Sequence, residues 1–236
     1  MARIGTEVKF TLPADQVEAG LTAFGLTGGD AGERTIYFVD RLDDAGDPWL
    51  FGNGVILRLR RDDADGSVDV TVKLRPAREE RLTGRWRPGT RHDADYRVGV
   101  GWARERVLSA SVEAKREEGL RELLDGRKRD AFTPEQQDFL RRCGPRLEQP
   151  MRHLCNAGPI RARRWHDITA GPLRGLRAEQ WTWGDGRTFL ELSLRCADDD
   201  ESAGRRALLA AEIDGHGLKP DESATTKTEA VLRGLL

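Results

Sequence analysis

The chain has 236 residues, of which 38% are hydrophobic and 33% are charged, and this composition supplies a core for one large domain or two small ones. Its 39 basic residues are balanced by 40 acidic ones, and the net charge of -1 excludes the overall basic field that nucleic-acid binding needs. No apolar run approaches about 18 residues, and the first residues lack the apolar core of a signal peptide, so we expect no membrane partner and a cytoplasmic protein. The three cysteines have no CxxC spacing, which argues against a disulfide framework or a zinc knuckle.

The first strand is expected at residues 4–12, where apolar and polar side chains alternate. A period of two is typical of a strand with one buried face, and it places Glu7 and Lys9 together on the polar face. A short amphipathic helix is predicted over residues 15–24. The β-branched and aromatic run TIYFVD then predicts a second strand.

The clearest strand pair is formed by FGNGVILRLR and SVDVTVKLR, which begin at residues 51 and 67. The intervening RDDADG has the composition of a tight turn, so we expect a hairpin. Aliphatic residues alternate with polar ones in both strands. The polar face carries Arg58 and Arg60 on the first strand and Lys73 and Arg75 on the second.

The middle of the chain changes character twice. The polar stretch RPAREERLTGRWRPGTRHDAD predicts an irregular loop, and YRVGVGW and RVLSASVEA predict two further paired strands. Leucines at helical spacing and the run Thr133-Pro134-Glu135-Gln136, with its possible capping box, then predict helices. We interpret residues 115–157 as a helical insertion between two β-rich halves of a single domain that spans residues 1–236.

The last third of the chain returns to strands and closes with helices. IRARRW, LRAEQWTW and FLELSLR predict strands, and GDG predicts a hairpin turn between the last two. Helices are expected near residues 203–215 and 226–235. The charged positions of these strands include Arg163, Glu179, Glu191 and Arg195.

Charged side chains on the non-aliphatic strand faces allow two interpretations. An antiparallel sheet commonly has one solvated side, and the pattern alone favours that interpretation. If the sheet instead closes, these side chains point into a lumen, where each buried unpaired charge costs several kcal/mol. A polyanion would relieve the repulsion, because guanidinium groups bind phosphate oxygens bidentately and nearby carboxylates can hold Mg²⁺ or Mn²⁺.

The ordered set TEVKF, GVILRLR, TVKLR, EQW, FLELSLR and TTKTEAVL resembles the CYTH superfamily, also called the triphosphate tunnel metalloenzymes. The resemblance extends over nearly the whole chain and rests on the order of the motifs together. It implies an α+β fold in which a closed antiparallel β-barrel forms a tunnel with peripheral helices. Members of the superfamily include triphosphatases that act on inorganic or organic triphosphates, thiamine triphosphatases and class IV adenylyl cyclases.

The resemblance also implies roles for individual residues. The expected catalytic residues, which grip the triphosphate, are Lys9, Arg58, Arg60 and Lys73. The wider set of basic residues expected to bind the substrate comprises Lys9, Arg58, Arg60, Lys73, Arg75, Arg163, Arg195 and Lys227. The acidic residues expected to hold Mg²⁺ or Mn²⁺ are Glu7, Glu179 and Glu191.

The metal site departs from the superfamily pattern. Gly5 stands where the ExExK signature has its first Glu, the strand around Gly99 lacks the usual acidic pair, and Ser193 replaces a second Glu; Glu113 is a possible substitute. The expected function is metal-dependent hydrolysis of a triphosphate-containing small molecule, such as tripolyphosphate or a nucleoside or thiamine triphosphate. The alternatives are a phosphate- or nucleotide-binding module without catalysis and an adenylyl cyclase-like enzyme. The sequence leaves the oligomeric state open.

Overall fold

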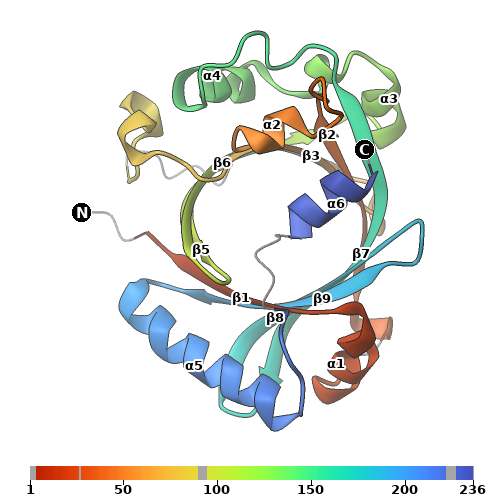
Figure 1. Cartoon of the computed structure of the whole chain (residues 1–236), viewed down its shortest axis with the longest axis vertical. Coiled ribbons are helices and arrows are strands. Elements are labelled where there is room, and N and C mark those ends of the chain that lie inside the picture. The colour runs from red at the N-terminus through yellow and green to blue at the C-terminus, as the bar shows by residue number, and fades with distance from the viewer. Residues whose placement is uncertain (1–3, 27, 90–94, 222–226, 236) are drawn as a thin grey trace.

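In the computed structural model, which describes residues 4–26, 28–89, 95–221 and 227–235, nine strands close into a barrel (Figure 1). The strands are β1 (Thr6–Leu12), β2 (Gly32–Asp40), β3 (Val55–Asp62), β4 (Val68–Leu74), β5 (Tyr96–Trp102), β6 (Arg106–Arg116), β7 (Cys155–Ala170), β8 (Leu173–Trp183) and β9 (Thr188–Cys196). Their order around the barrel is β1-β5-β6-β4-β3-β2-β7-β8-β9, and β9 pairs with β1 to close it. Within the described chain all pairs are antiparallel except β1–β5, which is parallel. The expected α+β barrel is confirmed, with one parallel pair that was not expected.

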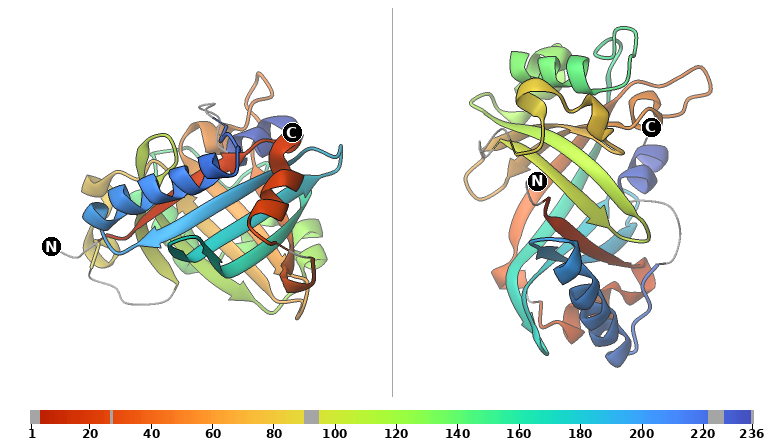
Figure 2. Two further views of the ribbon diagram at one scale, coloured as in Figure 1. Left: turned by 90° about the horizontal axis from the view of Figure 1, so that it is seen from below. Right: turned by 90° about the vertical axis from the view of Figure 1, so that its left-hand side faces the viewer.

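Helices cover the outside of the barrel and one of its ends. They are α1 (Val17–Ala23), α2 (Trp49–Gly52), α3 (Leu120–Asp125), α4 (Pro134–Cys143), α5 (Asp199–Gly215) and α6 (Lys227–Leu235), with short 3-10 helices at Ala14–Gln16, Gly28–Asp30, Glu79–Arg81, Gly84–Trp86 and Lys128–Ala131. Figure 2 shows α3 and α4 on the side of the barrel opposite α5. None of the described helices is long and apolar enough to cross a membrane.

The outer face of the barrel is apolar where helices cover it. On one side, Val8 of β1 and Leu192 of β9 are buried in a cluster with Leu209 and Ile213 of α5. The same alternation that buries these side chains sends Lys9, the next residue along β1, to the opposite face of the strand.

Helix α4 is fixed to the outside of β4 and β6 by one buried side chain. Gln136 Nε2 donates hydrogen bonds to the carbonyl oxygens of Val70 at 2.7 Å and Val112 at 3.0 Å. The backbone N–H of Gln136 donates to Thr133 Oγ1 at 3.2 Å, and the backbone N–H of Thr133 donates to Gln136 Oε1 at 3.0 Å. The predicted capping box is therefore present, and its glutamine also anchors the helix to the barrel.

The barrel interior has an apolar end and a charged remainder. Helix α6 lies within the ring of strands in the axial view of Figure 1, where Val231 and Leu232 are buried in a cluster with Phe38 and Trp181. Away from this end, the inward side chains of the strands are mostly charged. The charged strand faces therefore line a lumen. The alternative prediction, an open sheet with one solvated face, is wrong.

Candidate functional site

The inward side chains of the strands surround a cavity of about 1900 Å³. Among its described lining residues 13 are Lys or Arg and 8 are Asp or Glu, an excess of five basic residues. The residues of the predicted site that line this cavity are Glu7, Lys9, Arg58, Arg60, Lys73, Arg75, Glu179, Glu191 and Arg195. Residues far apart in the sequence are thus brought to one interior by strand pairing.

Lys9 lies between two of the carboxylates predicted to hold a metal. Its Nζ atom is 2.9 Å from Glu7 Oε2 and 3.1 Å from Glu191 Oε1. Burial favours the neutral form of Glu7, but the adjacent Lys9 ammonium outweighs burial and lowers the pKa of Glu7 to about 2. Burial likewise opposes the charge on Lys9, yet Glu191 and Glu7 raise the pKa of Lys9 above its ordinary value. Lys9 and Glu7 are therefore both charged at neutral pH.

Lys73, on β4, faces the same lumen, where the Glu7 carboxylate acts on it only from beyond salt-bridge distance. Within the described residues its ammonium makes no salt bridge or hydrogen bond, and neither does the guanidinium of Arg75 just beyond the strand. Burial, and then the positive charges of Lys9 and Arg75, lower the pKa of Lys73 to about 7. Neighbouring cations that destabilise one another in this way are suited to an anionic ligand.

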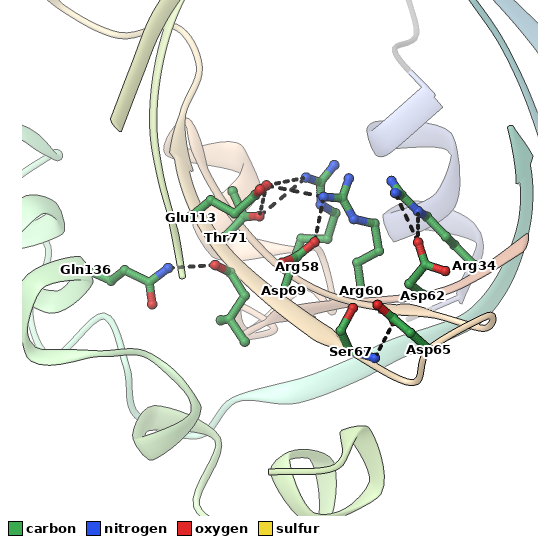
Figure 3. Close-up of polar contacts among 11 residues, drawn as sticks. Arg34, Arg58, Arg60, Asp62, Asp65, Ser67, Asp69, Thr71, Glu113 and Gln136 are labelled. Carbon is green, nitrogen blue, oxygen red and sulfur yellow. Dashed lines mark hydrogen bonds and ion pairs between the residues drawn. The ribbon is translucent and has the colours of Figure 1, made fainter. Parts of the chain in front are cut away.

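Arg58 and Arg60 project into the lumen from β3, where carboxylates orient them (Figure 3). Arg60 Nη2 lies 3.1 Å from Asp69 Oδ2 and 3.3 Å from Glu113 Oε2. Arg58 Nη2 lies 3.8 Å from the same Glu113 oxygen and donates a hydrogen bond to Thr71 Oγ1 at 3.3 Å. Burial and the neighbouring Arg60 lower the pKa of Arg58 to about 10, so its guanidinium remains charged at neutral pH.

Among the described residues of β2 and β3, three guanidinium nitrogens that face the lumen are buried with no hydrogen-bond partner, namely Arg34 Nη1, Arg58 Nε and Arg60 Nε. Arg34 lies on β2, and its Nε and Nη2 atoms both donate to Asp62 Oδ2, at 3.3 Å and 3.2 Å (Figure 3). A buried donor without a partner costs about 1–3 kcal/mol. Phosphate oxygens would satisfy such donors, so their grouping in one cavity indicates an anion-binding site.

The opposite wall of the lumen is formed by β7, β8 and β9. Glu179 of β8 is paired in register with Arg164 of β7 and with Glu191 of β9. Arg195 is 56% exposed, and its Nε atom lies 4.0 Å from Glu7 Oε1. We place Arg195 at the rim of the cavity and Glu179 on its wall.

The predicted placement of Arg163 in the lumen is wrong. Its guanidinium lies over the ring of Trp165, 5.0 Å from the centroid, on the outer face of the barrel. The reason is that β7 turns its apolar residues inward: Ile160 and Ala162 belong to the cluster beneath α6, so alternation places Arg164 in the cavity and Arg163 outside it. Lys227 begins α6, but its side chain lies outside the described residues.

Two basic residues that line the cavity, Arg34 and Arg164, were not among those predicted from the sequence. Arg34 could have been predicted, because it continues the alternation of Ile36 and Phe38 towards the N-terminus. The structure begins β2 at Gly32, two residues before Arg34. No sequence signal distinguishes the inward Arg164 from its neighbour.

The carboxylates suit a divalent ion that takes most of its ligands from water and from the phosphates of the substrate. Among the described residues, no group of three or more His, Cys, Asp and Glu side chains is arranged to hold a metal. Glu7 and Glu191 are instead joined through Lys9, with Glu179 beside Glu191. Mg²⁺ commonly takes only one or two protein carboxylates together with waters and substrate phosphates. The donor set therefore fits a phosphate-bound Mg²⁺ or Mn²⁺ rather than an all-protein cage.

Backbone packing leaves little room at two positions where the superfamily pattern has a carboxylate. A Cβ atom on Gly99 would lie 3.3 Å from the carbonyl oxygen of Gly5, and one on Gly5 would lie 3.3 Å from the carbonyl oxygen of Cys196. Glu113, the possible substitute, is bonded to the arginines of β3. The cavity therefore has fewer carboxylates that could bind a metal than the superfamily pattern has, whereas the predicted phosphate-gripping residues Lys9, Arg58, Arg60 and Lys73 are present.

Comparison with known proteins places this geometry in a known fold. No protein-family model and no curated protein matches the sequence. Among solved structures, the candidate adenylyl cyclase HpAC1 from Hippeastrum, described as having a dominant triphosphatase activity, matches with a TM-score of 0.59 and 16% identity, over 98% of this chain and 96% of that one. A candidate adenylate cyclase from Bacillus halodurans matches with a TM-score of 0.60 and 14% identity, over 97% and 98%. The chain has the CYTH-like fold.

The CYTH-like barrel of this chain provides two kinds of chemistry in one cavity. Fixed ammonium and guanidinium groups can stabilise negative charge without reorganisation, because the folded chain has already placed them. Carboxylates on the wall formed by β1, β8 and β9 can share a phosphate-bound cation with the ligand. Phosphoryl transfer depends mainly on positioning and on electrostatic stabilisation, and both the fixed cations and a carboxylate-bound metal ion can supply them.

Proposed function

We propose that the protein hydrolyses a triphosphate-containing small molecule inside the tunnel with the help of Mg²⁺ or Mn²⁺. The observation that carries the proposal is the convergence of the four predicted phosphate-binding cations on one lumen, beside Glu7 and Glu191. The lining has five more basic than acidic residues, and with Lys73 protonated this excess is close to the charge of tripolyphosphate, about 4 to 5 negative charges when each terminal group carries about 1.5 to 2. The dominant triphosphatase activity of the structurally similar Hippeastrum protein supports the same reaction class.

The cations have distinct roles in this proposal. Arg58 and Arg60 bind phosphate oxygens through donors that are unpartnered in the free protein, and Glu113 holds both guanidinium groups in position. Lys9 and Lys73 neutralise the charge that develops on the phosphoryl oxygens. Lys73 takes up a proton as the ligand binds, because a neighbouring phosphate favours its charged form.

The residues that would hold the metal are Glu7, Glu179 and Glu191. A divalent ion bound there supplies charge neutralisation at the phosphate oxygens and a template for an attacking water. Glu7 remains ionised throughout the neutral range, because the Lys9 ammonium holds its pKa at about 2. Lys9 also keeps Glu7 and Glu191 close together before the ligand arrives.

The test is release of inorganic phosphate from tripolyphosphate, ATP and thiamine triphosphate with Mg²⁺ or Mn²⁺. Release from at least one substrate, abolished by EDTA, is expected. If protein that is folded by circular dichroism and a cooperative melt releases phosphate from none of them, the proposal fails.

A second candidate is a binding module without catalysis, and the reduced carboxylate set favours it. Gly5 and Ser193 leave the metal side with fewer oxygen ligands than the superfamily pattern, while the anion-binding side is retained. Thermal stabilisation by tripolyphosphate without phosphate release would support this candidate. Production of cyclic AMP from ATP would instead support the cyclase alternative that the two matched structures suggest.

A further inference from the structure

A second group of basic side chains lies in the tunnel at the end opposite α6. Arg34 of β2, Arg164 and His166 of β7, and Arg177 of β8 line the cavity there. Arg34 pairs in register with Asp62 at the far end of β3, while β2 runs from Arg34 towards the apolar cluster that α6 fills. These basic groups are near neighbours, since the pKa of His166 is lowered by burial and then by Arg164, Arg177 and Arg34.

This group is poorly compensated within the folded chain. Among the residues that the structure describes, Arg164 and Arg177 make no salt bridge and no hydrogen bond through their side chains. Glu179 is the nearby carboxylate that stabilises the charge on Arg164, against burial and the charges of Arg34 and Arg60. Arg34 is fixed in orientation by Asp62, with Nη1 buried and unpartnered. The arrangement is a preoriented set of donors with room for an oxyanion.

Arg60 connects this group to the site proposed for the triphosphate. It pairs across the sheet with Ile36, two residues from Arg34 on the same face of β2, and it contributes to the electrostatic environment of Arg164. The apolar end of the barrel is occupied by α6, whereas the Arg34 end is lined by cations. A phosphate chain longer than three units would therefore extend towards Arg34.

We propose that Arg34, Arg164 and Arg177 form a second anion subsite, which binds the phosphates beyond the third in a linear polyphosphate. The inference rests on the proposed function only in taking the Lys9 and Arg60 cluster as the place of the first three phosphates. The preferred ligand is then a linear inorganic polyphosphate, which is anionic along its whole length.

The test is isothermal titration calorimetry with tripolyphosphate, tetrapolyphosphate and a longer linear polyphosphate, in EDTA so that no metal-dependent turnover occurs. We expect the wild-type protein to bind the longer chains about tenfold more tightly than tripolyphosphate, after correction for the number of equivalent registers. Arg34→Gln and Arg164→Gln should remove that gain while weakening tripolyphosphate binding less than about threefold. Arg161→Gln, on the exposed outer face of β7, is the matched control and should bind all chains like the wild type.

Two results would overturn the inference: equal affinity for all chain lengths in the wild type, or equal losses for short and long chains in Arg164→Gln. The wild-type chain-length series decides the matter even if a variant does not fold. Failure of the proposed function is distinguishable, because absence of phosphate release with metal leaves the binding result in EDTA unaffected.

Discussion

Changing the pH from 6 to 8 should change how the tunnel binds an anion, because Lys73 titrates in that interval. With a pKa of about 7, Lys73 is about 90% protonated at pH 6 and about 10% protonated at pH 8 in the free protein. A triphosphate beside it favours the ammonium form and raises its pKa. Binding should therefore take up about 0.9 proton at pH 8 and about 0.1 through this group at pH 6, and the binding constant should fall about tenfold per pH unit above pH 7.

The assay is titration calorimetry of tripolyphosphate at pH 8 in EDTA, in two buffers of different ionisation enthalpy. The terminal phosphates of the ligand exchange protons alike in the wild type and in the variants, so the difference in proton uptake between them belongs to Lys73. Lys73→Met should abolish the proton uptake, whereas Arg161→Gln should retain it. Binding without proton uptake in the wild type, or the same uptake in Lys73→Met, would refute this account of Lys73.

Other predictions concern the metal side of the cavity and the anchoring of α4. Glu191→Gln removes a proposed metal ligand and leaves Lys9 with Glu7, so the Mn²⁺ concentration for half-maximal phosphate release should rise about tenfold or more; an unchanged requirement would exclude Glu191 as a ligand. Gly5→Glu adds a carboxylate and should lower the Mn²⁺ concentration for half-maximal phosphate release. Gly5→Ala is its control, because it adds only the Cβ atom, 3.3 Å from the Cys196 carbonyl oxygen; the same half-maximal concentration in both variants would contradict this. Gln136→Leu should lower the free energy of unfolding in urea by about 2–3 kcal/mol, because two buried carbonyl oxygens lose their donor; a loss no larger than that of Gln137→Leu, on the same helix, would contradict it.

Much of the barrel could be predicted because its strands repeat a simple pattern. Alternation placed Lys9, Arg58, Arg60 and Lys73 on the polar faces of their strands, and the resemblance to a tunnel fold predicted that these faces turn inward. The capping box at Thr133 followed from local chemistry alone. These features depend on residues that are close together in the sequence, so they can be predicted without a structure.

The remainder depended on which face of a strand turns inward. Alternation in β7 separates Arg163 from Arg164, but only the packing of Ile160 and Ala162 beneath α6 decides that Arg164 faces the lumen. The parallel pairing of β1 with β5 joins segments about 90 residues apart, and a period of two carries no information on strand direction. The partnership of Glu113 with Arg60 likewise needs three strands in register.

The most direct test of the central claim is phosphate release from tripolyphosphate with Mg²⁺ or Mn²⁺, comparing the wild type with Arg58→Gln. Loss of a positioned cation that stabilises the transferring phosphoryl group should reduce turnover about 100-fold or more. Arg161→Gln, on the outer face of the barrel, should keep wild-type turnover. We expect metal-dependent release in the wild type that is lost in Arg58→Gln. Absence of release in the folded wild type, or equal release in Arg58→Gln, would contradict it.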